Sequence, residues 1–94
     1  MENNITPNEM KLMLATLQHY QFEMFGKQNV CIETRIDKDG ELWMIFESHL
    51  VDKDKNINEF VVNHCYPFWS YERNMEEFNE FVGKISEFLE NKEK

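Results

Sequence analysis

The chain has 94 residues, of which 18 are Asp or Glu and 10 are Lys or Arg, so its formal net charge is −8. A surface this negative repels phosphate backbones and anionic lipids, which argues against direct binding to nucleic acid or membranes and favours basic partners. Hydrophobic residues make up 41% of the chain, which is enough for a folded core. The length allows a single domain, residues 1–94.

The chain also lacks features that would direct it out of the cytoplasm. No stretch approaches the roughly 18 consecutive apolar residues of a membrane span, and the polar start, Met1 to Asn8, does not resemble a signal peptide. Two cysteines, Cys31 and Cys65, are too few for a disulfide framework. We therefore expect a cytoplasmic protein with two free thiols.

A first helix is predicted from the start signal around Pro7. Thr6 suits the cap, Pro7 the first helical position, and Glu9 completes a capping box. Gly26 is a natural stop. Apolar residues recur at helical spacing and form one stripe: Met10, Met13, Leu14, Leu17, Tyr20 and Met24. Three further apolar residues fall off that stripe: Leu12, Phe22 and Phe25.

Three strands are predicted next. Residues Gln28 to Asp37 alternate between apolar and polar, which is typical of a strand. The following Asp37-Lys38-Asp39-Gly40 predicts a hairpin turn, because Gly40 accepts positive φ. Glu41 to Val51 is predicted as the second strand, and Ile57 to Cys65 as the third.

A second helix is expected after an aromatic connector, residues 66–71. We place its start at Asn74, with Glu77 as the capping-box partner. Its buried stripe is Met75, Phe78, Phe81, Val82, Ile85, Phe88 and Leu89. The order predicts an α+β fold (α-β-β-β-α), a three-stranded antiparallel meander with both helices packed on one face. The stripes of the helices should then meet Val30, Ile32 and Ile36.

The second strand carries apolar residues on both faces. If the helices cover one face, Trp43 and Ile45 project from the other, and an exposed patch of this kind usually marks an interface. Two interpretations stay open: self-association or partner binding through this face, and burial beneath the aromatic connector.

The connector contains Tyr66, Phe68, Trp69 and Tyr71 beside Pro67. Aromatic residues this dense either anchor an interface or fold back as a lid over one end of the sheet. The lid is favoured, because a small domain needs the buried area. The Tyr66–Pro67 bond is open to either isomer.

Catalytic and metal-binding patterns are missing from the sequence. Four potential zinc ligands, Cys31, His49, His64 and Cys65, match no zinc spacing. The turn at Asp37 has Leu42 and Ser48 where a calcium loop needs Gly and an acid. With only three glycines, the chain has no phosphate-binding loop. We expect no cofactor, no metal site and no enzymatic activity.

The predicted order of elements is shared with double-stranded RNA-binding domains, which use basic groups to contact phosphates. Here residues 72–94 hold seven acids against four bases. Release of counterions from a nucleic acid cannot drive binding to such a surface. Direct binding of nucleic acid is therefore not expected.

The acidic surplus is spread unevenly. The net charge is −1 for residues 1–27, −4 for residues 28–71 and −3 for residues 72–94. It serves either as a solvated face that keeps the protein soluble or as a docking surface for a basic partner. The candidate docking acids are Asp37, Asp39 and Glu41 in the hairpin, and Glu72, Glu76, Glu77 and Glu80 on the second helix. The candidate apolar contacts are Trp43, Ile45 and Trp69.

In size, acidity and order of elements, the chain resembles the small phage-encoded anti-CRISPR proteins, which occupy the DNA-binding channel of a nuclease by mimicking the charge of DNA. The resemblance covers most of the chain and rests on no motif. It implies a small acidic inhibitor or adaptor, of anti-defence or nucleic-acid-mimic type, that docks on a basic protein surface. The alternatives are a homo-oligomeric or chaperone-like module that uses Trp43 and Ile45, and a small metal- or thiol-dependent enzyme.

Overall fold

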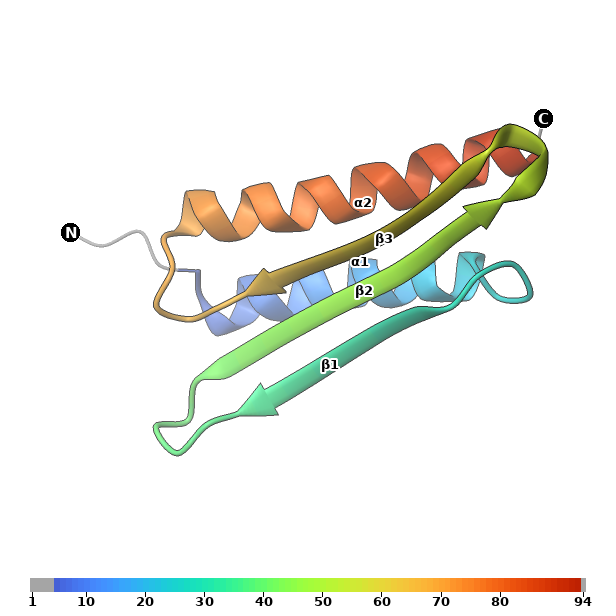
Figure 1. Ribbon diagram of the computed structural model, residues 1–94. Coiled ribbons are helices and arrows are strands. Elements are labelled where there is room, and N and C mark those ends of the chain that lie inside the picture. The colour runs from blue at the N-terminus through green and yellow to red at the C-terminus, as the bar shows by residue number, and fades with distance from the viewer. Residues whose placement is uncertain (1–4, 94) are drawn as a thin grey trace.

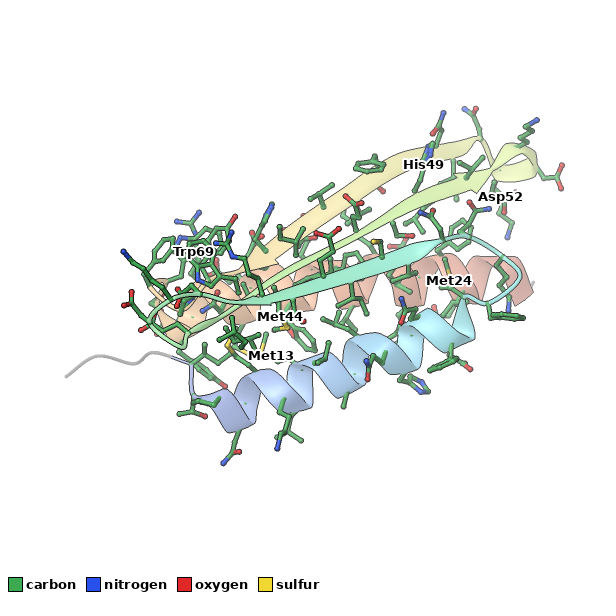
Figure 2. All side chains as sticks on the ribbon, turned by 90° about the horizontal axis from the view of Figure 1, so that it is seen from below. Met13, Met24, Met44, His49, Asp52 and Trp69 are labelled. Carbon is green, nitrogen blue, oxygen red and sulfur yellow. The ribbon has the colours of Figure 1, made fainter. Side chains whose placement is uncertain are left out.

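The computed structural model describes residues 5–93, with side chains through residue 90 (Figure 1). The elements in chain order are α1 (Pro7–Glu23), β1 (Val30–Ile36), β2 (Leu42–Asp52), a 3-10 turn (Lys53–Lys55), β3 (Ile57–Cys65) and α2 (Tyr71–Glu93). The strands form one antiparallel sheet in the order β1-β2-β3. Both helices lie on one face of it, and the other face is open (Figure 2). The predicted α-β-β-β-α fold is confirmed. No helix among residues 5–93 is long and apolar enough to span a membrane.

The start of α1 follows the predicted capping box. The Thr6 hydroxyl accepts from the Glu9 N–H at 3.2 Å, and the Glu9 carboxylate accepts from the Thr6 N–H at 2.9 Å. The helix ends before Gly26, whose φ is +80°. The predicted stripe turns inward and its buried members are Met10, Met13, Leu17 and Met24. The residues off that stripe are exposed: Leu12, Phe22 and Phe25.

The helices cover the three strands unequally. α2 runs along β3 and reaches β2, while α1 contacts α2 and β1. β1 is an edge strand, so the helices bury its first residue, Val30, but leave Ile36 63% exposed. The expectation that Ile36 packs against the helices is therefore wrong, because burial along β1 decreases from Val30 toward the far end of the strand, which the helices leave largely uncovered.

α2 begins at Tyr71, three residues before the predicted start at Asn74. Ser70 precedes it, and the Ser70 hydroxyl accepts from the Arg73 N–H at 3.2 Å. Asn74 is fully buried inside the helix, where its amide donates to the Tyr66 carbonyl at 2.9 Å and accepts from the Tyr66 N–H at 3.0 Å. Asn74 and Glu77 have capping-box spacing, but both side chains turn toward β3 and its end, so the predicted start is wrong.

The core lies between the two layers (Figure 2). Phe46 of β2 meets Phe81 of α2 edge to face, with ring centroids 5.0 Å apart. Other fully buried side chains come from every main element except β1: Leu17, Met24, Met44, Cys65, Asn74 and Ile85. The predicted stripe of α2 supplies Phe78, Phe81, Ile85, Phe88 and Leu89 to this core. The helical periodicity of α2 is thus confirmed although its start is not.

Candidate functional site

Asp37 is the first of the hairpin acids, and its carboxylate is used within the turn. One oxygen accepts from the N–H groups of Asp39 at 2.9 Å and Glu41 at 3.0 Å, and the other accepts from the Trp43 indole at 2.7 Å. The bond from Glu41, followed by that from Trp43, lowers the pKa of Asp37 below its usual value of 3.8. Asp37 therefore holds the hairpin in shape, while Asp39 and Glu41 stay exposed.

Three candidate acids form a row on α2. Glu72, Glu76 and Glu80 are exposed and lie four residues apart, so their Cβ atoms are about 6 Å apart along one side of the helix. That side is opposite the buried stripe. Among the described side chains, none of the three forms a salt bridge. We call Glu72, Glu76 and Glu80 the acidic row.

The acidic row ends near a lysine. Lys84 forms an ion pair with Glu59 of β3, and this hydrogen bond is the main cause that raises the pKa of Lys84. The charges of Glu80 and Glu87 act on Lys84 in the same direction. Lys84 therefore lies beside the Glu80 end of the acidic row and is already paired with Glu59.

Glu77 stands apart from the acidic row. It is half-buried, and its carboxylate accepts from the backbone N–H of His64 at 3.0 Å and from the Asn63 amide at 3.2 Å. Both bonds tie α2 to β3. Glu77 thus acts inside the fold, and sequence reasoning missed this because its partners lie 13 and 14 residues away along the chain.

The connector folds back over the open face of the sheet. Tyr66 lies 4.9 Å from Trp43 and 4.4 Å from Trp69 between ring centroids, and Phe68 lies 5.4 Å from Trp43. We call Trp43, Tyr66, Phe68 and Trp69 the aromatic cluster. Trp43 and Trp69 are half-buried in it, whereas Phe68 is 63% exposed. The favoured lid is therefore present with one exposed ring, and no peptide bond among the described residues is cis, Tyr66–Pro67 included.

Two arginines complete the aromatic cluster. The Arg35 guanidinium lies 4.6 Å from the centre of the Trp43 ring, and that of Arg73 lies 3.8 Å from the Trp69 ring. Such contacts between a cation and an aromatic face are favourable. Arg35 lies opposite Trp43 in the hairpin register. Sequence reasoning missed Arg73, although it follows Trp69 by four residues at a helix start.

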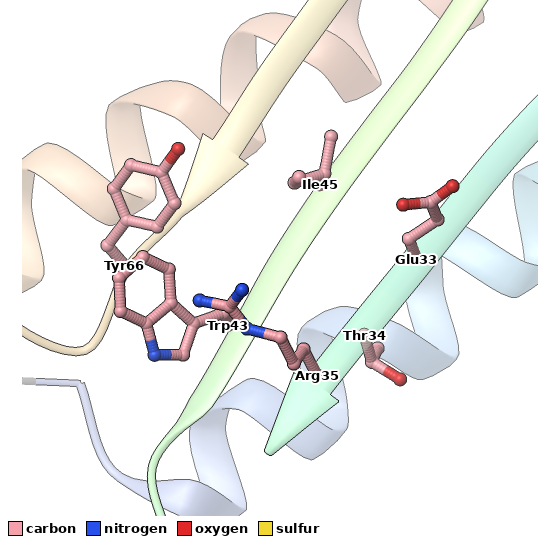
Figure 3. A pocket seen from close by; sticks show the side chains of 6 residues that line it. All are labelled: Glu33, Thr34, Arg35, Trp43, Ile45 and Tyr66. Atoms are coloured by element: carbon pink, nitrogen blue, oxygen red, sulfur yellow. The ribbon is translucent and has the colours of Figure 1, made fainter. Parts of the chain in front are cut away.

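A shallow depression of about 270 Å³ opens beside this cluster (Figure 3). Ile45, Trp43 and Tyr66 supply its apolar lining, and Glu33 and Arg35 of β1 supply charges of opposite sign. Ile45 is half-buried, as is Trp43. Farther along the open face, Phe60 and Val62 of β3 are exposed. The structure therefore places Trp43 and Ile45 on the open face, as predicted, but with less exposed area than an uncovered patch.

The potential metal ligands do not converge. Within the described residues, no group of three or more His, Cys, Asp or Glu side chains is placed to hold an ion. Cys31 and Cys65 are both free thiols. Burial, and to a smaller extent the charge of Glu77, raises the pKa of Cys65 to about 12. Its thiol is therefore protonated at neutral pH and a poor nucleophile.

The candidate residues occupy two separate surfaces. The acidic row lies on the outer side of the helix layer, whereas the aromatic cluster lies on the open face of the sheet. The hairpin and the start of α2 are at the same end of the molecule (Figure 1), so Asp39 and Glu41 lie at the end where the acidic row begins. No protein-family model, curated protein sequence or solved structure matches the chain.

Proposed function

We propose that this protein is a non-enzymatic binding module that docks the acidic row on a basic groove of a partner protein, as an inhibitor or an adaptor. The observation that supports the proposal is the acidic row itself: three exposed carboxylates on successive turns of α2, opposite its buried side and without a salt bridge among the described residues. The proposed partner is a nucleic-acid-binding protein, whose groove already accepts a line of negative charges.

The acidic row suits this role because its backbone is held in place. α2 packs along β3 through its buried stripe, so the points from which the three glutamates project are fixed before a partner arrives. Pre-arranged charges lose less conformational freedom on binding than charges on a mobile segment. The surrounding negative potential also steers a basic partner toward the row. Asp39 and Glu41 extend the charged surface at the hairpin end.

The open face is a weaker candidate for docking. Its largest side chain, Trp43, is covered by Tyr66, Phe68 and Arg35, and its indole N–H is already bonded to Asp37. The acidic row has no such cover. The proposal therefore assigns docking to α2 and leaves the aromatic cluster a role in holding the connector against the sheet.

The test compares two triple variants that remove the same number of charges. The first neutralises the acidic row with Glu72→Gln, Glu76→Gln and Glu80→Gln. The second, the matched control, carries Glu23→Gln, Glu47→Gln and Asp54→Asn at sites distributed over α1, β2 and the 3-10 turn. Binding is measured by the fluorescence anisotropy of a labelled oligo-arginine peptide.

We expect the row variant to bind the peptide about tenfold more weakly than the wild type, from about 0.5 kcal/mol for each exposed charge contact. The control should lose at most about twofold. Binding by the wild type should also fall steeply between about 50 mM and about 500 mM salt, because exposed charges are screened. Equal losses in the two variants would reject the acidic row as the docking site, and binding insensitive to salt would reject an electrostatic mode.

A further inference from the structure

The free edge of β1 carries a pattern that is complementary to itself. We propose that a second copy of this chain pairs with this edge, β1 against β1 in antiparallel orientation. The two-fold axis passes midway between Thr34 and the Thr34 of the second copy. The resulting dimer has one continuous six-stranded sheet. This proposal is independent of the acidic row, which lies on α2 and away from this edge.

The backbone of β1 is arranged to accept another strand. The Asp37 N–H donates to the Glu41 carbonyl at 3.0 Å, so Asp37 directs its backbone groups toward β2. These directions alternate along a strand. Glu33 and Arg35 therefore also bond toward β2, while Ile32, Thr34 and Ile36 direct their N–H and C=O groups to the free edge. The Val30 carbonyl, which faces the same edge, accepts from the Gln21 amide at 2.8 Å. Among the described residues, the edge from Ile32 to Ile36 has no strand beside it, and an edge of this kind is a template for another strand.

The side chains select the register. With Thr34 on the two-fold axis, Glu33 lies opposite the partner's Arg35, and the symmetry repeats this pair of opposite charges. An axis at Glu33 or at Arg35 instead places identical charges face to face, which is unfavourable. The Thr34 axis also makes Thr34 a pair that exchanges both backbone hydrogen bonds, as the free edge requires.

The side chains on the other face of β1, the face that carries Ile32 and Ile36, also fit the Thr34 register. Ile32 lies opposite the partner's Ile36, and this pair also occurs twice. Ile36 is 63% exposed and Ile32 is half-buried in the single chain, so pairing removes apolar surface that α1 does not cover. One face thus offers charge complementarity and the other apolar complementarity, which a symmetric interface requires of a single patch.

Arg35 must move for this pairing. In the single chain its guanidinium lies over Trp43 (Figure 3), and the side chain is exposed. Rotation about its own side-chain bonds carries the guanidinium outward to the free edge, with no change in the backbone of β1. Glu33, also exposed, points to the same face of the sheet (Figure 3).

The first test uses sedimentation velocity over a range of protein concentrations. The wild type should show a monomer–dimer equilibrium. Thr34→Pro should remain monomeric but folded by circular dichroism, because it removes an N–H that faces solvent in the single chain, where proline is tolerated on an edge strand. A wild type that stays monomeric at millimolar concentration would overturn the proposal.

The second test is a charge exchange, which also covers the case that Thr34→Pro fails to fold. Glu33→Arg alone should raise the dissociation constant of the dimer about tenfold, since both symmetric pairs change from attraction to repulsion. Adding Arg35→Glu should restore the wild-type dissociation constant, because opposite charges then face each other again across the interface. Failure of this rescue would overturn the Thr34 register. A dimer that survives these changes but is lost in Phe60→Ser would show that the copies meet through the open face instead.

Discussion

Several polar side chains in this protein act as internal connectors. Asp37 holds the hairpin, Asn74 bonds both backbone groups of Tyr66, and Glu77 joins α2 to β3. Buried or half-buried polar groups are tolerated when their hydrogen bonds are made inside the fold. Two of the three, Asp37 and Glu77, are therefore less available to a partner than their charge alone indicates.

The variant Asp37→Asn tests the role of the Asp37 carboxylate through the pH dependence of the free energy of unfolding. The pKa of Asp37 is lowered from 3.8, so its carboxylate stabilises the fold above about pH 4, and this contribution is lost as the pH falls through the folded-state pKa. We expect the variant to be less stable than the wild type at neutral pH, with the difference shrinking between about pH 5 and about pH 2. Urea denaturation at a series of pH values measures this.

The control for Asp37→Asn is Asp39→Asn in the same turn, where the side chain is exposed. It should follow the wild type across the pH range, because the hydrogen bonds from Glu41 and Trp43 go to Asp37. A stability difference for Asp37→Asn that does not change with pH would contradict the assigned role of the charge.

At the scale of elements, glycine is favoured over alanine in the hairpin turn but disfavoured within α2. Gly40 has a φ of +78°, in the left-handed region, whereas Gly83 lies within α2 without a positive φ. At neither position would an added Cβ meet another atom within 4 Å. Any effect of alanine at these sites is therefore conformational rather than steric.

Gly40→Ala and Gly83→Ala should consequently change stability in opposite directions. Gly40→Ala should destabilise by about 1 kcal/mol, because alanine is strained at positive φ. Gly83→Ala should stabilise by about 1 kcal/mol, because alanine is the better helix former. Thermal or urea unfolding measures both changes. Two changes of the same sign would contradict either the turn geometry or the position of Gly83 in the helix.

At the scale of the whole molecule, two layers enclose one core and leave one sheet face open. The molecule is elongated, with extents of 48 × 22 × 18 Å, because strands and helices run along the same direction (Figure 1). A two-layer fold this thin has a narrow core, and Cys65 of β3 lies fully buried in it. Its thiol therefore reports on the opening of the whole core.

Cys65 should resist alkylation until the protein unfolds. Its pKa of about 12 and its complete burial both suppress reaction with iodoacetamide at about pH 8. Cys31 is half-buried on the open face and should react in the native state. We expect Cys65 to react at least about a thousandfold more slowly than in urea. Mass spectrometry separates the two sites, and equal native rates would contradict the buried position of Cys65.

The sequence alone determined the types and order of the elements, because the repeat of apolar residues sets which side of a helix or strand is buried. The stripes of α1 and α2, the hairpin at Gly40 and the two faces of β2 all follow from such local patterns. Only the tertiary structure decided how the polar and aromatic residues are used. Asn74 and Glu77 bond to β3 and its end instead of capping a helix, Tyr66 covers Trp43, and Ile36 stays exposed. In each case the outcome depends on whether a residue distant in the sequence packs against the side chain, so no local spacing could indicate it.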